Sequence, residues 1–366
     1  MKGQVSQRDL ARIAGVSPMT VSLALRGHPS IPSSTRARIV KLAEQNHYRP
    51  DPALAALNAY RANQTASACY HGTLAWVTGF PSREGWRKMI QTTGYFEGAA
   101  ARADQLGYRL EEFWIAEPGL NAKRATQILL SRGVRGLIIA PLPVPRGKLD
   151  LDWRQFSAAS LGFSLVEPKL HVVMNNQFRN MKQVVKQLHM LGHRRIGLAM
   201  PSANDERVDH NYLAGFWIAQ QDAPPDAARL EALLAKDFSK KTFNAWFRRT
   251  RPDAIVVATS HHDQVTGWLS EQGLRVPADI SLVVAALPHG DTVISGVDEN
   301  VPSIGAHAVE TVVGMIHRNE RGVPARPFSL LIEGVWTDGR TACARRVSAA
   351  KARPKSKRQS RPRSTS

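Results

Sequence analysis

Apolar residues near the N-terminus of this 366-residue chain recur at helical spacing and predict three short helices. The first begins after Ser6, a hydroxyl N-cap followed three residues later by Asp9 in the pattern of a capping box, and Gly15 ends it. The second begins at Ser17-Pro18, where a hydroxyl N-cap precedes proline at the first helical position. The third is expected from about residue 33 to residue 45. The residues expected to face a common core are Leu10, Ile13, Ala14, Val21, Ala24, Leu25, Ile39 and Leu42.

From Gly72 onward, short apolar runs typical of strands alternate with amphipathic helical stretches. Repeated units of this kind predict parallel sheets covered by helices on both faces, which is the α/β class. The pattern restarts after Pro168, so we expect two lobes, the second beginning there, with the strand at 280–285 as the last. The expected strands are residues 73–77, 108–115, 136–140, 172–174, 195–200, 254–258 and 280–285, and the expected helices are residues 95–106, 122–131, 181–191 and one from Tyr212.

The charge of the chain is strongly positive. Forty-nine Lys and Arg against 30 Asp and Glu give +19, which indicates a polyanionic partner, either nucleic acid or an anionic membrane surface. Residues 1–63 hold nine basic and three acidic side chains, and residues 345–366 hold nine basic and none acidic. Because the middle of the chain is close to neutral, we expect the two ends to meet the polyanion and the middle to have another role.

The remaining features exclude several classes of protein. Cys69 and Cys343 belong to no CxxC pair and no Cys/His cluster, which argues against a disulfide scaffold and a zinc module. The N-terminal residues lack the apolar region of a signal peptide and no apolar run is long enough to cross a bilayer, so we expect a soluble cytoplasmic protein without a membrane partner. No phosphate-binding loop, dinucleotide-binding glycine motif, nucleophile elbow or HExxH motif is present, so we expect no enzyme activity, cofactor or metal. The alternative is a solute-binding protein or an α/β enzyme in which the N-terminal helices are an accessory domain.

Two short helices joined through a glycine turn, with a third packed behind them, form either a helix-turn-helix domain or a generic three-helix bundle. Residues 9–17, followed by Thr20-Val21-Ser22, resemble the DNA-binding headpiece of the LacI/GalR family of bacterial transcriptional regulators, and Thr35-Arg36 and residues 48–50 continue the match in register. The looser matches to the effector domain of that family are residues 191–197, 251–254 and 273–281. The resemblance implies a periplasmic-binding-protein-like domain of two lobes, between which the chain crosses three times.

The resemblance also implies that the helix from Ser17 to Arg26 lies in the major groove of double-stranded operator DNA. Pro18 and Met19 would then face base edges, and Leu23, where the family usually has a polar residue, would pack on a thymine methyl group. Phosphate contacts, which set the register on DNA without reading its sequence, are expected from Ser6, Thr35 and Arg36. The complete set of expected DNA contacts is Ser6, Ser17, Pro18, Met19, Thr20, Ser22, Leu23, Arg26, Thr35, Arg36, Tyr48, Leu54 and Leu57.

Residues 51–58 form an Ala/Leu-rich segment that is typical of a short linker helix. In the family this place holds a hinge helix that orders on specific DNA, and paired hinge helices insert a leucine into the minor groove; the matching residue is Leu57. The segment is too short to be a stable helix alone, which is consistent with folding on binding. The implied protein is a repressor that binds a pseudo-palindromic operator as a homodimer and is switched by a small-molecule effector.

The positions that grip sugar hydroxyls in the family differ in this chain. Tyr212 stands in place of an Arg, Ser260-His261-His262 in place of an Asn-Asp pair, and Leu287 or a neighbour in place of an Asp. A carbohydrate effector stays a candidate, although a conventional small sugar fits these positions poorly. The effector is expected at the carboxyl ends of the strands, between the lobes. The candidates for binding it are Phe80, Trp86, Asn176, Tyr212 and His261, with ordinary packing as the alternative for the aromatic side chains.

Four regions are therefore expected: a headpiece at 1–50, a hinge helix and linker at 51–68, an effector-binding and dimerisation domain at 69–344, and a basic tail at 345–366. The tail is mostly Lys, Arg, Pro, Ser and Thr, so we expect it to be disordered. It would add salt-sensitive affinity for DNA phosphates, or it would act only as a solubilising extension. It contains no leucine heptads, so a coiled-coil tetramerisation segment is not predicted.

Overall fold

The computed structural model describes residues 5–25, 31–46, 48 and 71–345 of the chain. The predictions for Arg26, for the hinge segment with Leu54 and Leu57, and for the tail beyond Arg345 lie outside the described residues.

The three N-terminal helices form where the sequence predicts them: α1 (Gln7–Ala14), α2 (Pro18–Leu25) and α3 (Ser33–Gln45). They share a small core of their own that includes Leu10, Val21 and Ile39. The prediction for Ile13 is wrong, because its side chain is 51% exposed and Ala11 is buried instead. Residues 10, 11 and 14 lie within about 100° on a helix of 3.6 residues per turn, and the small Ala11 lets the neighbouring helices approach closely.

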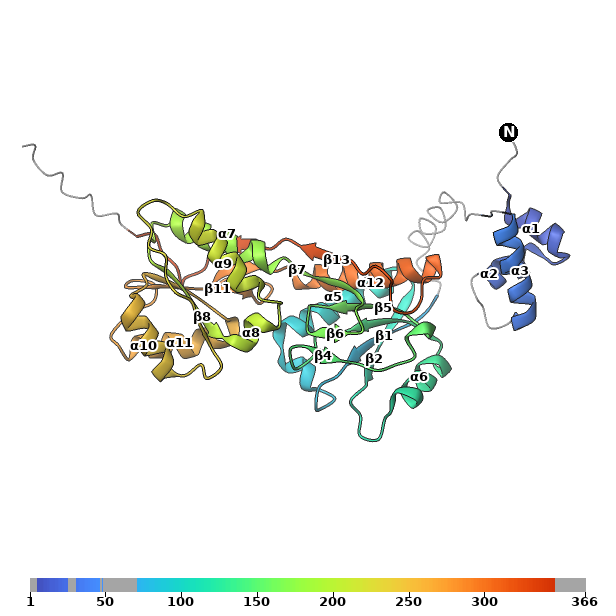
Figure 1. The fold of residues 1–366 in the computed structure, drawn as a ribbon, viewed down its shortest axis with the longest axis horizontal. Coiled ribbons are helices and arrows are strands. Elements are labelled where there is room, and N and C mark those ends of the chain that lie inside the picture. Colours follow the sequence, from blue (N-terminus) through green and yellow to red (C-terminus); the bar gives the residue numbers. More distant parts are fainter. Residues whose placement is uncertain (1–4, 26–30, 47, 49–70, 346–366) are drawn as a thin grey trace, which may run out of the picture.

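Residues 71–175 and 301–332 form lobe 1, a parallel sheet covered on both faces (Figure 1). Its strands are β1 (Gly72–Thr78), β2 (Tyr108–Trp114), β3 (Val134–Ile139), β5 (Ser157–Leu161), β7 (His171–Asn175) and β13 (Ser329–Ile332), and a small pair is formed by β4 (Gly147–Lys148) and β6 (Leu165–Glu167). The strand order of the main sheet is β13-β7-β5-β3-β1-β2. α5 (Ile90–Gln105) and α12 (Val301–Arg318) cover one face, and α6 (Ala122–Ser131) covers the other. Short 3₁₀ turns lie at Gly85–Lys88 and Trp153–Gln155.

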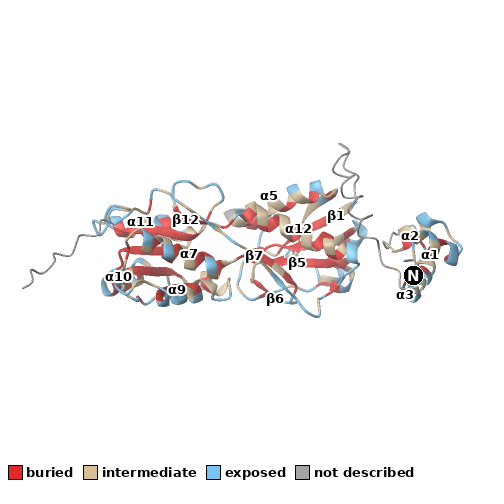
Figure 2. Ribbon diagram, turned by 90° about the horizontal axis from the view of Figure 1, so that it is seen from above, coloured by how far each residue is buried: buried red, intermediate tan, exposed pale blue. Residues whose placement is uncertain are grey.

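Residues 176–300 and 333–345 form lobe 2 around a second six-stranded sheet. Its strands are β8 (Ile196–Pro201), β9 (Leu233–Ala235), β10 (Ala254–Val257), β11 (Ser281–Leu287), β12 (Ser295–Asp298) and β14 (Val335–Thr337), in the order β14-β12-β11-β10-β8-β9 with β14 antiparallel. One face is covered by α7 (Gln177–Met190) and α9 (Asn211–Gln221), and the other by α10 (Lys240–Thr250) and α11 (His262–Ser270). The short α8 (Ser202–Glu206) follows β8, and a 3₁₀ turn at Thr259–His261 follows β10. Figure 2 shows the buried strands between exposed helical surfaces in both lobes.

Within residues 71–345 the chain crosses between the lobes three times, after β7, after β12 and after β13. The expectation that the second lobe begins after Pro168 is wrong, because β7 pairs with β5 and completes the sheet of lobe 1. The strand at 280–285 is also not the last. β12 extends the sheet of lobe 2, and α12 and β13 then return to lobe 1. Hydrophobic periodicity identifies a strand but does not say which sheet it joins.

The helices α5 and α12 of lobe 1 cross with their backbones in near contact. A Cβ atom at Gly98 would lie 1.9 Å from the carbonyl oxygen of Pro302, and one at Gly305 would lie 1.9 Å from that of Tyr95. Only glycine permits this approach, so the crossing is specified by these two positions. No helix among residues 5–25, 31–46 and 71–345 is long and apolar enough to span a bilayer.

Candidate DNA-binding surface and inter-lobe site

The first turn of α2 is capped and faces solvent. Ser17 Oγ accepts a hydrogen bond from the backbone N–H of Thr20 at 3.0 Å, which confirms the predicted hydroxyl cap. Ser17, Pro18 and Met19 are all exposed, and Met19 keeps 64% of its surface accessible. The exposed first turn of this helix therefore presents the apolar side chain of Met19 beside a backbone that is already capped. An exposed helix start of this kind suits insertion into a groove of DNA.

Other expected base-reading residues are partly inside the headpiece. Leu23 and Tyr48 pack against the headpiece core, and Thr20 and Ser22 are partly buried. Leu23 therefore contributes to the stability of the domain as well as to the surface of α2.

Two of the three expected phosphate contacts already hold structural hydrogen bonds. The Ser6 hydroxyl and the Asp9 carboxylate form the predicted capping box at the start of α1. Arg36 Nη2 donates to the carbonyl oxygen of Ile31 at 3.1 Å. Thr35 is partly buried in the first turn of α3. A phosphate contact by Ser6 or Arg36 would thus be made in addition to its structural role.

The structure places Phe80 and Trp86 in the core of lobe 1. Trp86 is fully buried, with its ring centroid 5.9 Å from that of Trp76 and 5.1 Å from that of Phe96. Phe80 is 7% exposed, and its carbonyl oxygen accepts a hydrogen bond from Trp114 Nε1 at 2.8 Å. Packing accounts for the environment of the Phe80 ring, whereas Trp86 Nε1 is buried without a hydrogen-bond partner in the described residues, and Arg87 Cζ lies 4.3 Å from the centroid of the Trp86 ring.

Asn176 lies at the first crossing between the lobes, where it caps α7. Its side chain accepts a hydrogen bond from the backbone N–H of Arg179 at 3.2 Å and donates to Glu333 Oε1 at 3.1 Å. Glu333 lies at the third crossing and also pairs with Arg179 at 3.2 Å. Asn176 therefore joins two of the crossing segments.

Tyr212, at the start of α9, faces a buried carboxyl group that sequence reasoning missed. Glu299 is 3% exposed at the second crossing, and burial raises its pKa to about 8, with Asp298 adding to the shift and a hydrogen bond with Tyr212 opposing it. Burial, together with the charge of Glu299, raises the pKa of Tyr212 well above that of an ordinary tyrosine. Burial and the charge of Glu299 also raise the pKa of Tyr95 in α5, so this acid acts on a phenol of each lobe. Chain position just after a strand end is the signal that could have pointed to Glu299.

His261 follows β10 at the same end of the sheet of lobe 2. Its Nδ1 pairs with Ser260 Oγ at 2.9 Å, its ring meets Phe238 edge-on at 5.2 Å, and burial lowers its pKa. His262 is buried and pairs with Asp263, so the two histidines face different surroundings. In the described part of the chain, no three His, Cys, Asp or Glu side chains are grouped to hold a metal ion.

Family models match two parts of the chain. Residues 7–51 match the model of bacterial regulatory proteins of the lacI family, and residues 185–335 match the periplasmic binding protein-like domain. The first match spans α1 to α3. The second spans most of lobe 2, together with α12 and β13 of lobe 1. The N-terminal helices thus match the lacI family, and most of lobe 2 matches a periplasmic binding protein-like domain.

The proteins to which this chain is similar agree with the fold. The HTH-type transcriptional regulator AglR of Rhizobium meliloti (strain 1021) is 41% identical over 49 residues, which are 13% of this chain and 14% of that protein. A structure of the transcriptional regulator CelR in complex with cellobiose superimposes with a TM-score of 0.55 at 18% identity, covering 93% of this chain and 100% of that one. The lac repressor dimer bound to operator and the anti-inducer ONPF gives a TM-score of 0.52 at 20% identity, with the same coverage. At these identities the solved structures establish the fold alone.

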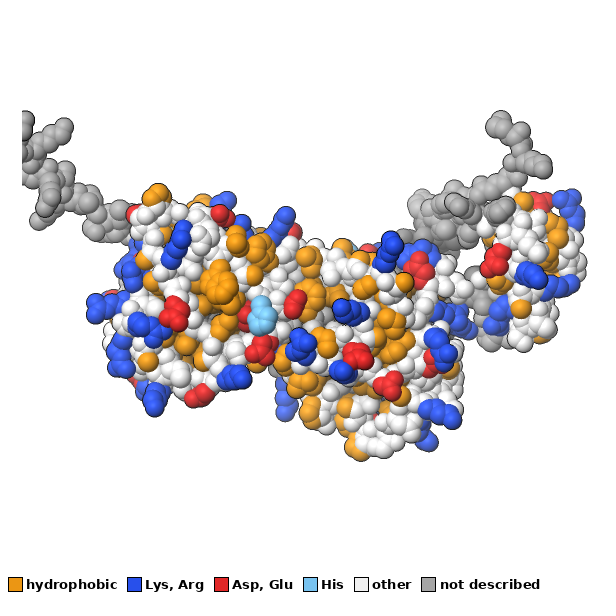
Figure 3. All heavy atoms as spheres, in the orientation of Figure 1, with side chains coloured by type: hydrophobic (Ala, Val, Ile, Leu, Met, Phe, Trp, Pro, Cys, Tyr) orange, Lys and Arg blue, Asp and Glu red, His pale blue; other side chains and the backbone are white. Residues whose placement is uncertain are grey.

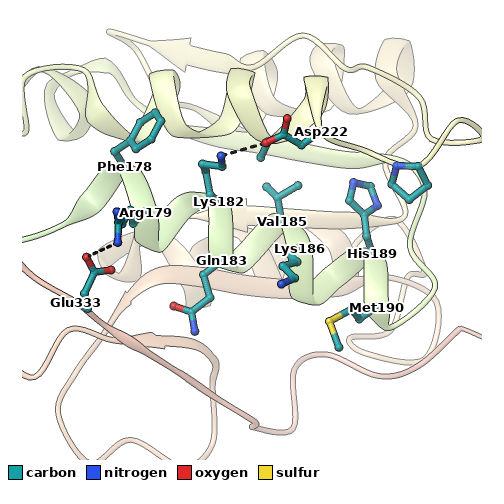
Figure 4. Close-up of a pocket in the computed structure, with 12 residues that line it drawn as sticks. Phe178, Arg179, Lys182, Gln183, Val185, Lys186, His189, Met190, Asp222 and Glu333 are labelled. Carbon is teal, nitrogen blue, oxygen red and sulfur yellow. Dashed lines mark hydrogen bonds and ion pairs between the residues drawn. The ribbon is translucent and has the colours of Figure 1, made fainter.

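The space-filling view shows basic and acidic side chains interspersed over both lobes (Figure 3). A groove of about 970 Å³ lies on the outer helical layer of lobe 2, between α7 and α9 (Figure 4). Two of its basic side chains are paired, Lys182 with Asp222 at 3.0 Å and Arg179 with Glu333 at 3.2 Å. The groove runs along α7 from Glu333 at the third crossing, and none of the expected effector residues lines it.

Proposed function

We propose that this protein is a sequence-specific transcription regulator, a repressor, that binds a pseudo-palindromic operator as a homodimer in the bacterial cytoplasm. The observation that carries the proposal is the folded three-helix headpiece, whose second helix presents Ser17, Pro18 and Met19 to solvent at its start. The excess of basic residues in the first 63 positions supports it, because long-range attraction to phosphates supplies much of the affinity of such domains for DNA.

We further propose that the two-lobed body binds a small-molecule effector between the lobes and transmits its presence to the headpieces. Tyr95 from lobe 1, and Tyr212 and Glu299 from lobe 2, supply hydroxyl and carboxyl groups that suit a hydroxyl-rich ligand. Similar structures were solved with cellobiose and with glucose, so a carbohydrate is the first class to test. A thermal-shift screen of sugars and related metabolites tests this part: a compound that raises the melting temperature of the wild-type protein but not of Tyr212→Phe supports it.

The headpiece assignment is tested by gel shift against genomic fragments, comparing the full chain with a chain that starts near residue 66. The full chain is expected to retain specific fragments that the shortened chain does not. Equal retention by both would contradict the assignment and favour a solute-binding protein or an α/β enzyme.

The hinge is tested separately with Leu57→Ala, because paired leucines in the minor groove bend the operator and act only on specific sites. The substitution is expected to weaken operator binding far more than binding to nonspecific DNA. If both weaken equally, Leu57 does not enter the groove.

A further inference from the structure

The side chain of Arg207 crosses from lobe 2 to lobe 1. Its Nη2 donates to the carbonyl oxygen of Leu142 at 2.7 Å, and its Nη1 donates to that of Pro143 at 2.8 Å. A guanidinium holds its N–H groups in a fixed planar fork, so two successive carbonyls determine both its position and its orientation. These bonds join the two lobes through residues that belong to none of the three crossing segments.

The acceptors in lobe 1 are held rigidly. Leu142 is 3% exposed, and its backbone N–H donates to Ser164 Oγ at 2.8 Å. The segment contains Pro141, Pro143 and Pro145, whose rings fix the backbone angle φ. The fixed φ angles and the hydrogen bond to Ser164 therefore restrict the movement of the two carbonyl oxygens.

The donor in lobe 2 is also held in position. Arg207 directly follows α8, and its backbone N–H donates to the carbonyl oxygen of Ala203 at 3.1 Å. The fully buried carboxylate of Asp205 accepts the backbone N–H of Leu213 at 3.0 Å and pairs with His210 Nδ1 at 3.0 Å. This network fixes the loop between α8 and α9, which begins with Arg207 and ends close to Tyr212.

We propose that Arg207 is a positioning residue that sets the angle between the two lobes. The crossing segments form one connection between the lobes, and a second connection through other residues restricts rotation about the first. The loop that carries Arg207 also leads into the helix of Tyr212, so a ligand bound at Tyr212 acts on the clamp (the Arg207 guanidinium with the carbonyls of Leu142 and Pro143). The effect of the clamp on DNA binding rests on the proposed function; its effect on lobe geometry does not.

The test measures the distance between the lobes in the full chain by pulsed electron spin resonance. Spin labels are placed at Lys123→Cys on α6 and Gln264→Cys on α11, both exposed, in a Cys69→Ser/Cys343→Ser background. Labelled chains are diluted with unlabelled ones, so that only distances within one chain are recorded. The variants are Arg207→Gln, which removes the charge, and Arg207→Lys, which keeps the charge but lacks the fork.

Arg195→Gln is the matched control. Arg195 also donates to two successive carbonyls, those of Thr250 and Arg251, but all three residues lie within lobe 2. Arg207→Gln is expected to lower the population of the wild-type distance at least about tenfold relative to other distances, because two hydrogen bonds from a charged group are lost. For Arg207→Lys we expect a population of the wild-type distance between those of the wild type and Arg207→Gln. Arg195→Gln is expected to keep the wild-type distance distribution.

A wild-type distribution in Arg207→Gln would overturn the proposal, and so would an equal change in Arg195→Gln, because the cause would then be a general loosening of lobe 2. Gel shifts with the same variants separate this inference from the proposed function. If Arg207→Gln changes the lobe distance but leaves operator affinity as in the wild type, the clamp stands and the proposed coupling between lobes and headpiece fails.

Discussion

Arg345 Nη1 lies 2.7 Å from Asp253 Oδ2, so the last described residue of the chain is paired with a buried carboxylate at the start of β10. The same carboxylate accepts the backbone N–H groups of Arg194 and Arg195 at 3.0 and 3.1 Å. Burial raises the pKa of Asp253, but the His193 imidazole, whose Nδ1 lies 3.4 Å from Asp253 Oδ1, and the hydrogen bonds from these two N–H groups outweigh it and hold the pKa far below its usual range. One ionised side chain thus joins β10, the entry to β8 and the C-terminal segment.

We expect Asp253→Asn to lower the free energy of unfolding by about 2–4 kcal/mol at neutral pH. Because the folded-state pKa is depressed, the contribution of Asp253 is present above its unfolded pKa of about 3.8 and is lost as pH falls toward the folded value. Denaturant unfolding between pH 3 and pH 7 measures both effects. Asp279→Asn is the control, since that carboxylate also has a lowered pKa, about 2, but its side chain is 33% exposed beside Arg275. An equal loss of stability in both variants would contradict the importance of the buried network.

The contribution of Glu299 to stability should depend on pH in the opposite direction to that of Asp253. Its pKa is raised to about 8 by burial, so its contribution is fully present below the unfolded pKa of about 4.5 and is lost as pH rises through about 8. Glu299→Gln keeps the shape and a hydrogen-bonding group for Tyr212 but cannot ionise. We expect the variant to be more stable than the wild type by roughly 1–3 kcal/mol near pH 8, with the difference shrinking toward pH 5. Thermal melts of both proteins between pH 5 and pH 8 measure this difference in stability. A difference that grows toward pH 5 would contradict a raised pKa for Glu299.

The sequence predicts the individual helices and strands of this protein better than it predicts which of them pair or make contact. Capping at Ser6 and Ser17 and the helix at 122–131 follow from local rules and are confirmed. β5 was not predicted, because Ser157-Ala158-Ala159-Ser160-Leu161 has no β-branched or aromatic residue and is a strand only through pairing with β3 and β7. Arg207 could not be identified either, because its partners are backbone carbonyls 64 and 65 residues away, and no side-chain motif records such a contact.

Met19 and Leu23, on the same short helix, should separate DNA recognition from stability. Met19 is 64% exposed, so Met19→Ala is expected to leave the melting temperature of the headpiece unchanged while weakening operator binding by about 1–3 kcal/mol and leaving nonspecific binding unchanged. Leu23 packs against the headpiece core, so Leu23→Ala is expected to lower both stability and affinity. Calorimetry and gel shifts on the same samples make the comparison. A loss of nonspecific binding in Met19→Ala, equal to its loss of operator binding, would show that Met19 does not face the bases.

The close crossing of α5 and α12 leads to a prediction about stability, which a second glycine substitution in another helix controls. Gly98→Ala would place a methyl group 1.9 Å from the carbonyl oxygen of Pro302, a backbone atom that cannot turn aside, so the two helices must separate. We expect the free energy of unfolding to fall by about 2–3 kcal/mol. Gly267→Ala, within α11, meets nothing within 4 Å and should instead raise stability by about 0.5–1 kcal/mol, because alanine restricts the unfolded chain and favours a helix. Denaturant unfolding of both variants measures these changes in the free energy of unfolding. If Gly98→Ala were as stable as Gly267→Ala, the two helices would have to pack farther apart than in this structure.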